Sequence, residues 1–431
     1  DAYNVVYATF ILTGAILGDR FGRKKLFLFG TALFGLGSAL SALSPGAGVL
    51  ISSRVVTGLG AAIALPISLS IVSATYADEK ARNRAIGIWS GINGVAIAVG
   101  PSAGGVLVDR FGWRAIFVMF LPVVIAAFVL TLAAVGESRS EEARSLDWRG
   151  QSLAVATLGL FTFGAIEGPA LHWNASVVAT LAGSVAAFAG FIVVERRSEQ
   201  PLVQLDMFRN ANFSGALVVT LIMTFGMYSF LFIIPNYLQT VTKFSALTTG
   251  LLLLPQGVFF AALSPFVGHW MGVVGPRRMI VLGMGLQAAG FLTTLALGVH
   301  GPAWLVIVQT TLLGLALGCE TGPLMSVAMA AVPKDRFGMP SGVVNVVRLT
   351  GATLGVAVLG SIFAVHAGAT ADAAAFLAGT RVAMLVAAAT AVLAIGIALV
   401  TLRRPAPRTA HGEGRREGVP RPARRAYSGR R

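Results

Sequence analysis

A series of long apolar runs, separated by short polar loops, most constrains what this chain can fold into. Each run is close to the length of about 17 to 25 residues that crosses a bilayer as a helix. Of 431 residues, 55% are hydrophobic and 12% are charged, about half the charged share of an average soluble domain. The 51 glycines let helices approach one another closely, as they do in membrane bundles. The sequence therefore predicts an all-α polytopic membrane protein with thirteen spans, at Tyr3–Leu17, Leu26–Leu43, Val49–Tyr76, Ala85–Val108, Ala115–Val135, Gln151–Leu171, Val177–Val194, Phe213–Pro235, Thr248–Met271, Met279–Val299, Trp304–Ala330, Ser341–Val365 and Val382–Leu402.

The positive charges predict how these spans are oriented. If the first span runs inward, the inward loops hold 17 Lys and Arg residues and the outward loops hold 4. This is the bias that the positive-inside rule requires. A further ten lie in the last segment, Arg403–Arg431. We expect a multi-pass protein of the inner (plasma) membrane with a disordered, basic cytoplasmic tail that is attracted to anionic lipid or, alternatively, to an acidic soluble protein.

Several classes of function are not supported by the residues. The net charge of +15 is compatible with nucleic-acid binding, but its location at membrane loops and in the tail argues against a nucleic-acid partner. The single cysteine, Cys319, excludes an intramolecular disulfide and a thiolate cluster, and the five histidines lack metal-ligand spacing. A phosphate-cradling GxxxxGK[ST] loop and a catalytic triad are also missing. We therefore expect no enzyme activity, no cofactor and no metal, and we expect that ATP does not drive the protein.

One short loop concentrates charge between the first two predicted spans. It reads Gly18-Asp19-Arg20-Phe21-Gly22-Arg23-Lys24-Lys25. Asp19 beside Arg20 and Arg23, with Gly22 at the turn, suggests a conformational latch. In this hypothesis one state of the protein makes an ion pair that another state breaks.

Three stretches resemble motifs of the major facilitator superfamily of transporters. Ala15–Lys24 resembles the signature loop between its second and third helices, although Ala15 stands where the family usually has Gly. Arg54–Ala62 is similar to its R-x-x-x-G-x-G-A-A motif. The pattern Gly91-x8-Gly100-Pro101-x2-Gly104-Gly105 resembles the antiporter motif of its fifth helix, which marks exporters.

The resemblance implies a major facilitator fold of two helical bundles. A drug:proton antiporter branch of the family has fourteen helices, two of them extra and central, and thirteen spans fit that branch if one helix precedes Tyr3. The predicted domains are an N-terminal bundle at 1–135 (first helix missing), a linker with two extra transmembrane helices at 136–212, a C-terminal bundle at 213–402 and the tail at 403–431.

Three ionisable residues inside predicted spans are candidates for a proton and substrate cavity, because such residues are costly in a membrane. Arg54 is a candidate proton relay or charge control, or alternatively a snorkelling residue at the interface. Glu320 lies near the expected midplane among Gly318, Gly322 and Pro323, and it is a candidate proton carrier or a structural carboxyl. Arg348 resembles the arginine of the family's N-x-x-R-x-x-G pattern, and a structural ion pair is an equal alternative.

Two further features are interpreted as structural. Asp109 is expected to be a solvated charge at the outer mouth. A run of methionines and aromatic residues between Met223 and Phe232 is expected to pack against lipid, with a promiscuous pocket as the alternative.

The resulting functional hypothesis is a monomeric secondary transporter. It would couple proton entry to the efflux of small amphipathic or cationic drugs by alternating access, with Gly100 and Pro101 sealing the interface between bundles. The alternatives are a metabolite exporter, an uptake transporter of the same fold, or a membrane protein that does not transport.

Overall fold

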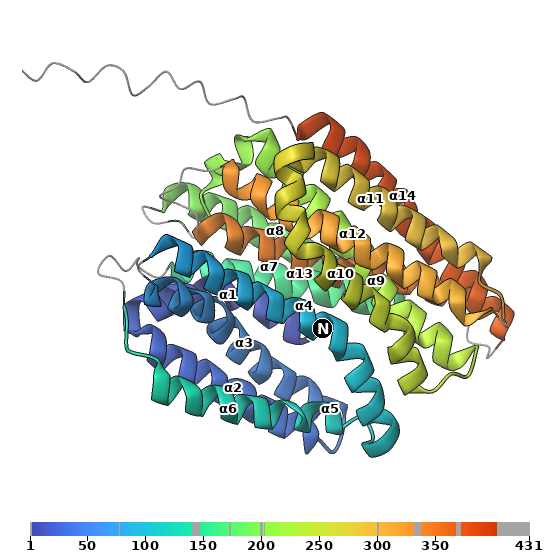
Figure 1. Ribbon diagram of the computed structural model, residues 1–431, viewed down its shortest axis with the longest axis horizontal. Coiled ribbons are helices and arrows are strands. Elements are labelled where there is room, and N and C mark those ends of the chain that lie inside the picture. Colours follow the sequence, from blue (N-terminus) through green and yellow to red (C-terminus); the bar gives the residue numbers. More distant parts are fainter. Residues whose placement is uncertain are drawn as a thin grey trace, which may run out of the picture.

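The described part of the chain is entirely helical. The computed structural model describes residues 2–76, 78–139, 147–171, 174–198, 201, 203–299, 301–331, 338–367 and 372–402, and these ranges contain no β-strand. The helices lie side by side with broadly aligned axes (Figure 1). The predicted all-α architecture is confirmed, and the predicted tail at 403–431 lies outside the described residues.

The first group of helices packs through small residues. Gly37 of the second helix lies against the Thr57 side chain and backbone, and Gly60 lies against the backbone of Phe34, so that a Cβ atom at either glycine would collide with the neighbouring helix. Without side chains in the way, the two backbones approach closely, which gains dispersion energy in a bilayer. The helices of this group are α1 (Ala2–Phe21), α2 (Arg23–Ala42), α3 (Ala47–Thr75), α4 (Glu79–Phe111), α5 (Ala115–Val118) and α6 (Phe120–Ala134).

Two central helices form a hairpin, α7 (Trp148–Ala170) and α8 (Ala175–Arg197). Asn174 caps α8 through a hydrogen bond from the Val177 N–H, 3.1 Å long. Buried polar bonds attach α7 to the first group, because the Gln151 side-chain amide donates to the Thr9 carbonyl at 2.9 Å and accepts from the Thr13 hydroxyl. The hairpin is therefore hydrogen-bonded to α1.

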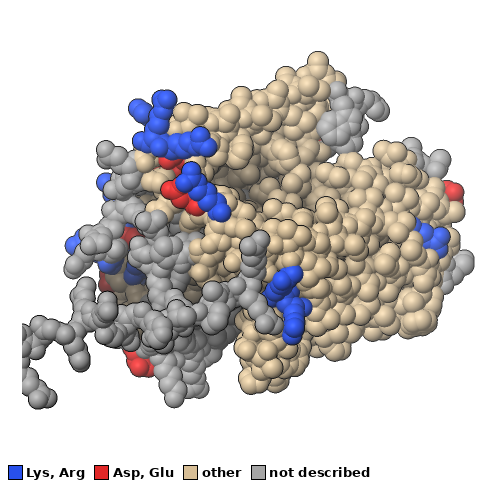
Figure 2. Space-filling model, turned by 90° about the horizontal axis from the view of Figure 1, so that it is seen from above, with Lys and Arg blue, Asp and Glu red and all other residues tan. Residues whose placement is uncertain are grey.

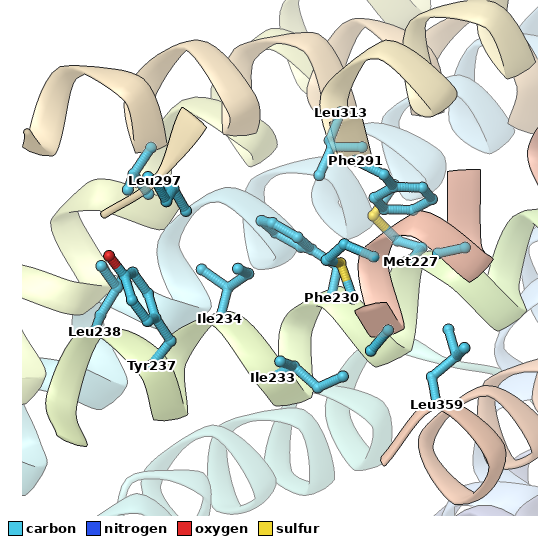
Figure 3. Close-up of a cluster of buried hydrophobic side chains, with 14 of the residues drawn as sticks. Met227, Phe230, Ile233, Ile234, Tyr237, Leu238, Phe291, Leu297, Leu313 and Leu359 are labelled. Carbon is cyan, nitrogen blue, oxygen red and sulfur yellow. The ribbon is translucent and has the colours of Figure 1, made fainter. Parts of the chain in front are cut away.

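The remaining helices pack around α9, whose inward face is almost fully buried. Figure 3 shows this core, in which Phe230 of α9 faces Phe291 of α11, and Tyr237 of α9 points toward Leu297. Burial of such large side chains within one helix group sets how its members are rotated. The elements of this group are η1 (Leu205–Arg209), α9 (Ala211–Thr240), α10 (Ala246–Val274), α11 (Pro276–Leu292), η2 (Thr293–Ala296), α12 (Ala303–Ala330), α13 (Gly338–Ala367) and α14 (Ala373–Thr401).

Each of the thirteen predicted spans coincides with a long helix or with a helix and a short neighbour. Ten of the described helices are long and apolar enough to cross a membrane. Two predicted starts are wrong: α4 begins at Glu79 and α14 at Ala373, because Asp78 and Asp372 cap their first turns. Residues 115–135 form two helices, α5 and α6, that meet at Met119.

Charges separate the two ends of the molecule. In Figure 2 most of the visible Lys and Arg side chains lie toward one end, and most of the rest of this face is uncharged. We call the end that carries the α1–α2 loop the inner end, following the charge bias of the loops, and the opposite end the outer end. The two large helix groups meet along two lines, where α4 packs against α10 and where α1 packs against α13.

Candidate functional site

The loop between α1 and α2 is a tight turn built on Gly22. Its φ of 107° lies in the region that only glycine adopts without strain. Asp19, in the last turn of α1, pairs with Arg23 at the start of α2, with the carboxylate 2.7 Å from Nη2 and 2.8 Å from Nε. Arg20 is exposed and stacks over the Phe21 ring. The structure thus brings Asp19 together with Arg23 and leaves Arg20 outside the pair.

Glu137, which follows α6 and belongs to none of the sequence motifs, also binds the loop between α1 and α2. Its carboxylate accepts from the backbone N–H groups of Lys24 and Lys25, 3.0 and 3.3 Å away. These are among the first N–H groups of α2, which lack partners inside the helix, and Gly22 offers no side chain to cap them. A carboxylate at a helix N-terminus is also favoured by the helix dipole. The only signal in the sequence was an acid just after the α6 span.

Arg54 of α3 is half-buried among aromatic rings. Its guanidinium carbon lies 4.5 Å from the Tyr3 ring centre and 5.6 Å from that of Phe117, and Tyr3 stacks on Tyr7. Within the described ranges it forms no ion pair, so these cation–π contacts are what stabilises its charge. Arg54 therefore lies beside the outer half of α1.

Arg348 of α13 borders a small cavity of about 10 Å³, enough for about one water molecule. Thr220 and Met223 of α9 and Thr321 of α12 line the same cavity. Its sequence neighbours Leu349 and Thr350 line a second small cavity together with Asn4 and Val5 of α1. Arg348 thus lies near the line where α1 meets α13.

Glu320 of α12 is the third candidate. It is fully buried, its side chain packs against Gly283 of α11, and neither carboxylate oxygen has a hydrogen-bond partner among the described residues. Helix α11 packs on α12 and α14 inside the second helix group. Thr321, the neighbour of Glu320 in the sequence, lines the same cavity as Arg348, and a shared cavity for Arg54, Glu320 and Arg348 stays a prediction.

The outer half of α4 carries the antiporter-like pattern, and it packs tightly on α10. A Cβ atom at Gly105 would lie 2.5 Å from the Ala246 carbonyl oxygen, and the Ser102 hydroxyl donates to the Gly250 carbonyl at 3.1 Å. Gly250 itself lies against the Pro101 carbonyl. Pro101 and Gly105 therefore belong to this contact line.

Two other glycines of the pattern have no neighbouring helix close to their Cβ position. Gly100 and Gly104 have no described atom within 4 Å of where a Cβ would lie, and the surroundings of Gly91 are outside the described residues. The interface between α4 and α10 therefore uses only part of the motif.

Asp109 is exposed at the outer end, as expected of a solvated charge, but it also has partners in the protein. Its carboxylate accepts from the backbone N–H groups of Ala246 and Leu247, 3.1 and 2.7 Å away. These are the first two residues of α10, in the other helix group. Asp109 thus joins the two groups at the outer end.

The methionine and aromatic run on α9 is mostly buried, and of its residues Met223 lines the small cavity beside Arg348. Met223, Met227 and Phe230 are buried in the core of the second group. Only Tyr228 and Phe232 are exposed. The expectation of lipid packing is therefore wrong for the three buried residues.

The family model of the Major Facilitator Superfamily matches residues 2–355 and 216–431, and so most of the chain. The chain belongs to this superfamily. The superfamily's fold and the multi-pass membrane character of this transporter follow from that match, which confirms the predicted superfamily, while the fourteen-helix branch stays a prediction.

Among similar curated proteins is the multidrug resistance protein Stp of Mycobacterium tuberculosis. It is 38% identical over 370 residues, which cover 86% of this chain and 69% of Stp. The tetracenomycin C resistance and export protein of Streptomyces glaucescens is 34% identical and covers 85% of this chain, with 69% of its own length matched. The drug efflux pump JefA of Mycobacterium tuberculosis is 31% identical, over 85% of this chain and 72% of JefA.

Solved transporters share the fold at low sequence identity. The POT family transporter PepTSo has a TM-score of 0.68 at 16% identity and covers 93% of this chain and 88% of its own. The human organic anion transporter MFSD10 has a TM-score of 0.62 at 15% identity, with 92% and 82% covered. These likenesses show the arrangement of the helices.

Proposed function

We propose that this transporter exports drug-like small molecules in exchange for protons by alternating access. The observation that carries the proposal is its similarity, over more than four fifths of the chain, to relatives named as resistance and efflux proteins. In the structure two groups of helices meet where α4 packs against α10 and where α1 packs against α13, which supports a mechanism in which the groups rock against each other.

At the outer end, the α4–α10 line keeps the two groups closed. Pro101 and Gly105 allow the backbones to touch, and close contact excludes water and ions from this end while substrate enters from the other. This supports the sealing role expected for Pro101, and it does not extend to Gly100, which has no described atom within 4 Å of its Cβ position. The contact consists of backbone and small side chains, so little side-chain rearrangement is needed when it parts.

At the inner end, Asp19 and Arg23 form the latch together with Glu137. All three hold the α1–α2 turn in one shape, through the ion pair and through the bonds to the start of α2. A change of state that moves the start of α2 relative to α1 or to the segment after α6 has to break charged hydrogen bonds, and this cost opposes the change.

Within the membrane, Glu320 is the proposed proton carrier. Carboxyl groups inside membrane bundles serve as proton relays in pumps and transporters. Because Glu320 is buried between α12 and α11, its proton reaches water only when these helices shift. Arg54 and Arg348 are proposed to act instead near the lines between the groups, where they sense the substrate or the proton.

The experiment is ethidium efflux from energised cells with and without a protonophore, for the parent protein and for Glu320→Gln. Glutamine has nearly the same shape and cannot carry the proton, so we expect normal expression and loss of protonophore-sensitive efflux. The matched control is Glu167→Gln on α7, an acid that lies outside the second helix group, and we expect it to retain efflux. Efflux that persists with the protonophore would contradict proton coupling, and full efflux by Glu320→Gln would remove Glu320 from the mechanism.

A further inference from the structure

The start of α10 has two backbone donors that its own helix does not use. The first N–H groups of a helix have no partner inside it. Ser245 caps α10 and accepts from the Thr248 N–H at 3.1 Å, and the Thr249 N–H bonds the Ser245 carbonyl at 3.0 Å. The N–H groups of Ala246 and Leu247 remain, and both donate to Asp109 of α4.

Asp109 is an unfavourable residue for its own helix. It lies in the last turn of α4, where the helix dipole presents partial negative charge and disfavours an acid. The same carboxylate is favourable at the start of α10, where the dipole is positive. A helix dipole therefore stabilises the charge of Asp109 only when α4 and α10 are in contact.

The position of Asp109 continues the tight contact line. Pro101, Gly105 and Asp109 are spaced four residues apart, so they share one face of α4. The first contacts Gly250, the second contacts Ala246, and the third contacts the N-terminus of α10. Moving outward along α4, the contact changes from backbone packing to a charged hydrogen-bonded pair.

We propose that Asp109 is an outer clasp, a positioning residue that holds the outer ends of the two helix groups together in the inward-facing state and releases them in each transport cycle. The proposal rests on alternating access as proposed above. Because Asp109 is exposed, water can replace its two bonds when the helices part. The clasp therefore biases the closed state without locking it.

The test measures opening of the outer end directly. In a background in which Cys319 is replaced by Ser, Ser102→Cys places one thiol on the α4 face that packs against Gly250. A membrane-impermeant maleimide is added outside, without substrate and without a proton gradient, and the rate of labelling is measured. Asp109→Asn keeps the size of the side chain and removes its charge, and we expect labelling at least about threefold faster.

The matched control is Asp372→Asn. Asp372 is also an acid at the outer end that accepts from a backbone N–H, that of Ala374 at 3.1 Å, but both belong to α14. We expect its labelling rate to equal that of the parent, and Asp109→Glu to restore part of the slow labelling. Size-exclusion chromatography in detergent checks that all variants are folded.

Equal labelling of Asp109→Asn and Asp372→Asn would overturn the clasp. Faster labelling of Asp109→Asn alone would support it, whether or not the same cells export ethidium. Because labelling needs no transport, a failure of drug export would count against the proposed function and leave the clasp standing.

Discussion

Adding one methyl group at Gly105 is expected to push the outer ends of α4 and α10 apart. The Cβ of Gly105→Ala would lie 2.5 Å from the Ala246 carbonyl oxygen and 2.9 Å from the Leu247 Cα, where ordinary contact begins at 3.4 Å. The nearby atoms are backbone, so they cannot turn away as a side chain can. The helices must separate by roughly 1 Å or bear the strain.

The magnitude follows from the cost of overpacking. Extra atoms in a well-packed site cost about 1–3 kcal/mol. If this cost falls on the outer-closed state alone, the ratio of open to closed molecules rises about fivefold to 150-fold, since 1.4 kcal/mol is a factor of ten. Alanine also stabilises the helix by about 0.8–1 kcal/mol relative to glycine, so the thermal stability of the protein should not fall with it.

The assay is the outer labelling of Ser102→Cys, combined with ethidium efflux. We expect Gly105→Ala to label faster and to export more slowly than the parent. Gly104→Ala is the comparator on the neighbouring helix position, because no described atom lies within 4 Å of its Cβ, and it should resemble the parent in both measurements. If Gly104→Ala and Gly105→Ala behave alike, the reasoning from this contact is falsified.

Two other substitutions test contacts away from this line. Gln151→Leu should lower the free energy of unfolding in detergent by about 1–3 kcal/mol. The substitution removes the buried hydrogen bonds between α7 and α1 and leaves the Thr13 hydroxyl unpaired. An unchanged thermal unfolding temperature would contradict this prediction. Gly283→Ala should slow ethidium efflux at normal expression, because the new methyl group collides with the Glu320 side chain and displaces its carboxyl. Gly285→Ala, on the same helix with no described atom nearby, is its control.

Much of the fold follows from local sequence. The apolar runs predicted the membrane helices because a bilayer requires about 20 apolar residues from each. The errors lie at helix starts, where Asp78 and Asp372 begin α4 and α14 before the apolar runs do. An acid just before a helix-forming stretch is a capping signal, so both helix starts could have been predicted from the sequence.

The candidate site was less accessible to prediction, because contacts between distant segments leave no local pattern. The pair of Asp19 and Arg23 is four residues apart, which is a helix-surface spacing visible in the sequence. The partners of Asp109 lie 137 and 138 residues away. The direction in which Glu320 points depends on the rotation of α12, which is set by packing against α11.

The α7–α8 hairpin makes the transporter asymmetric toward the surrounding lipid. Helix α7 is bonded to α1 and also lines, with α1 and α13, a small cavity bounded by Leu158 and Leu349. It therefore covers one of the two lines where the halves meet, while the hairpin leaves the α4–α10 line uncovered. A compound dissolved in the membrane would then reach the boundary between the two helix groups at the α4–α10 flank only, because α7 covers the other flank.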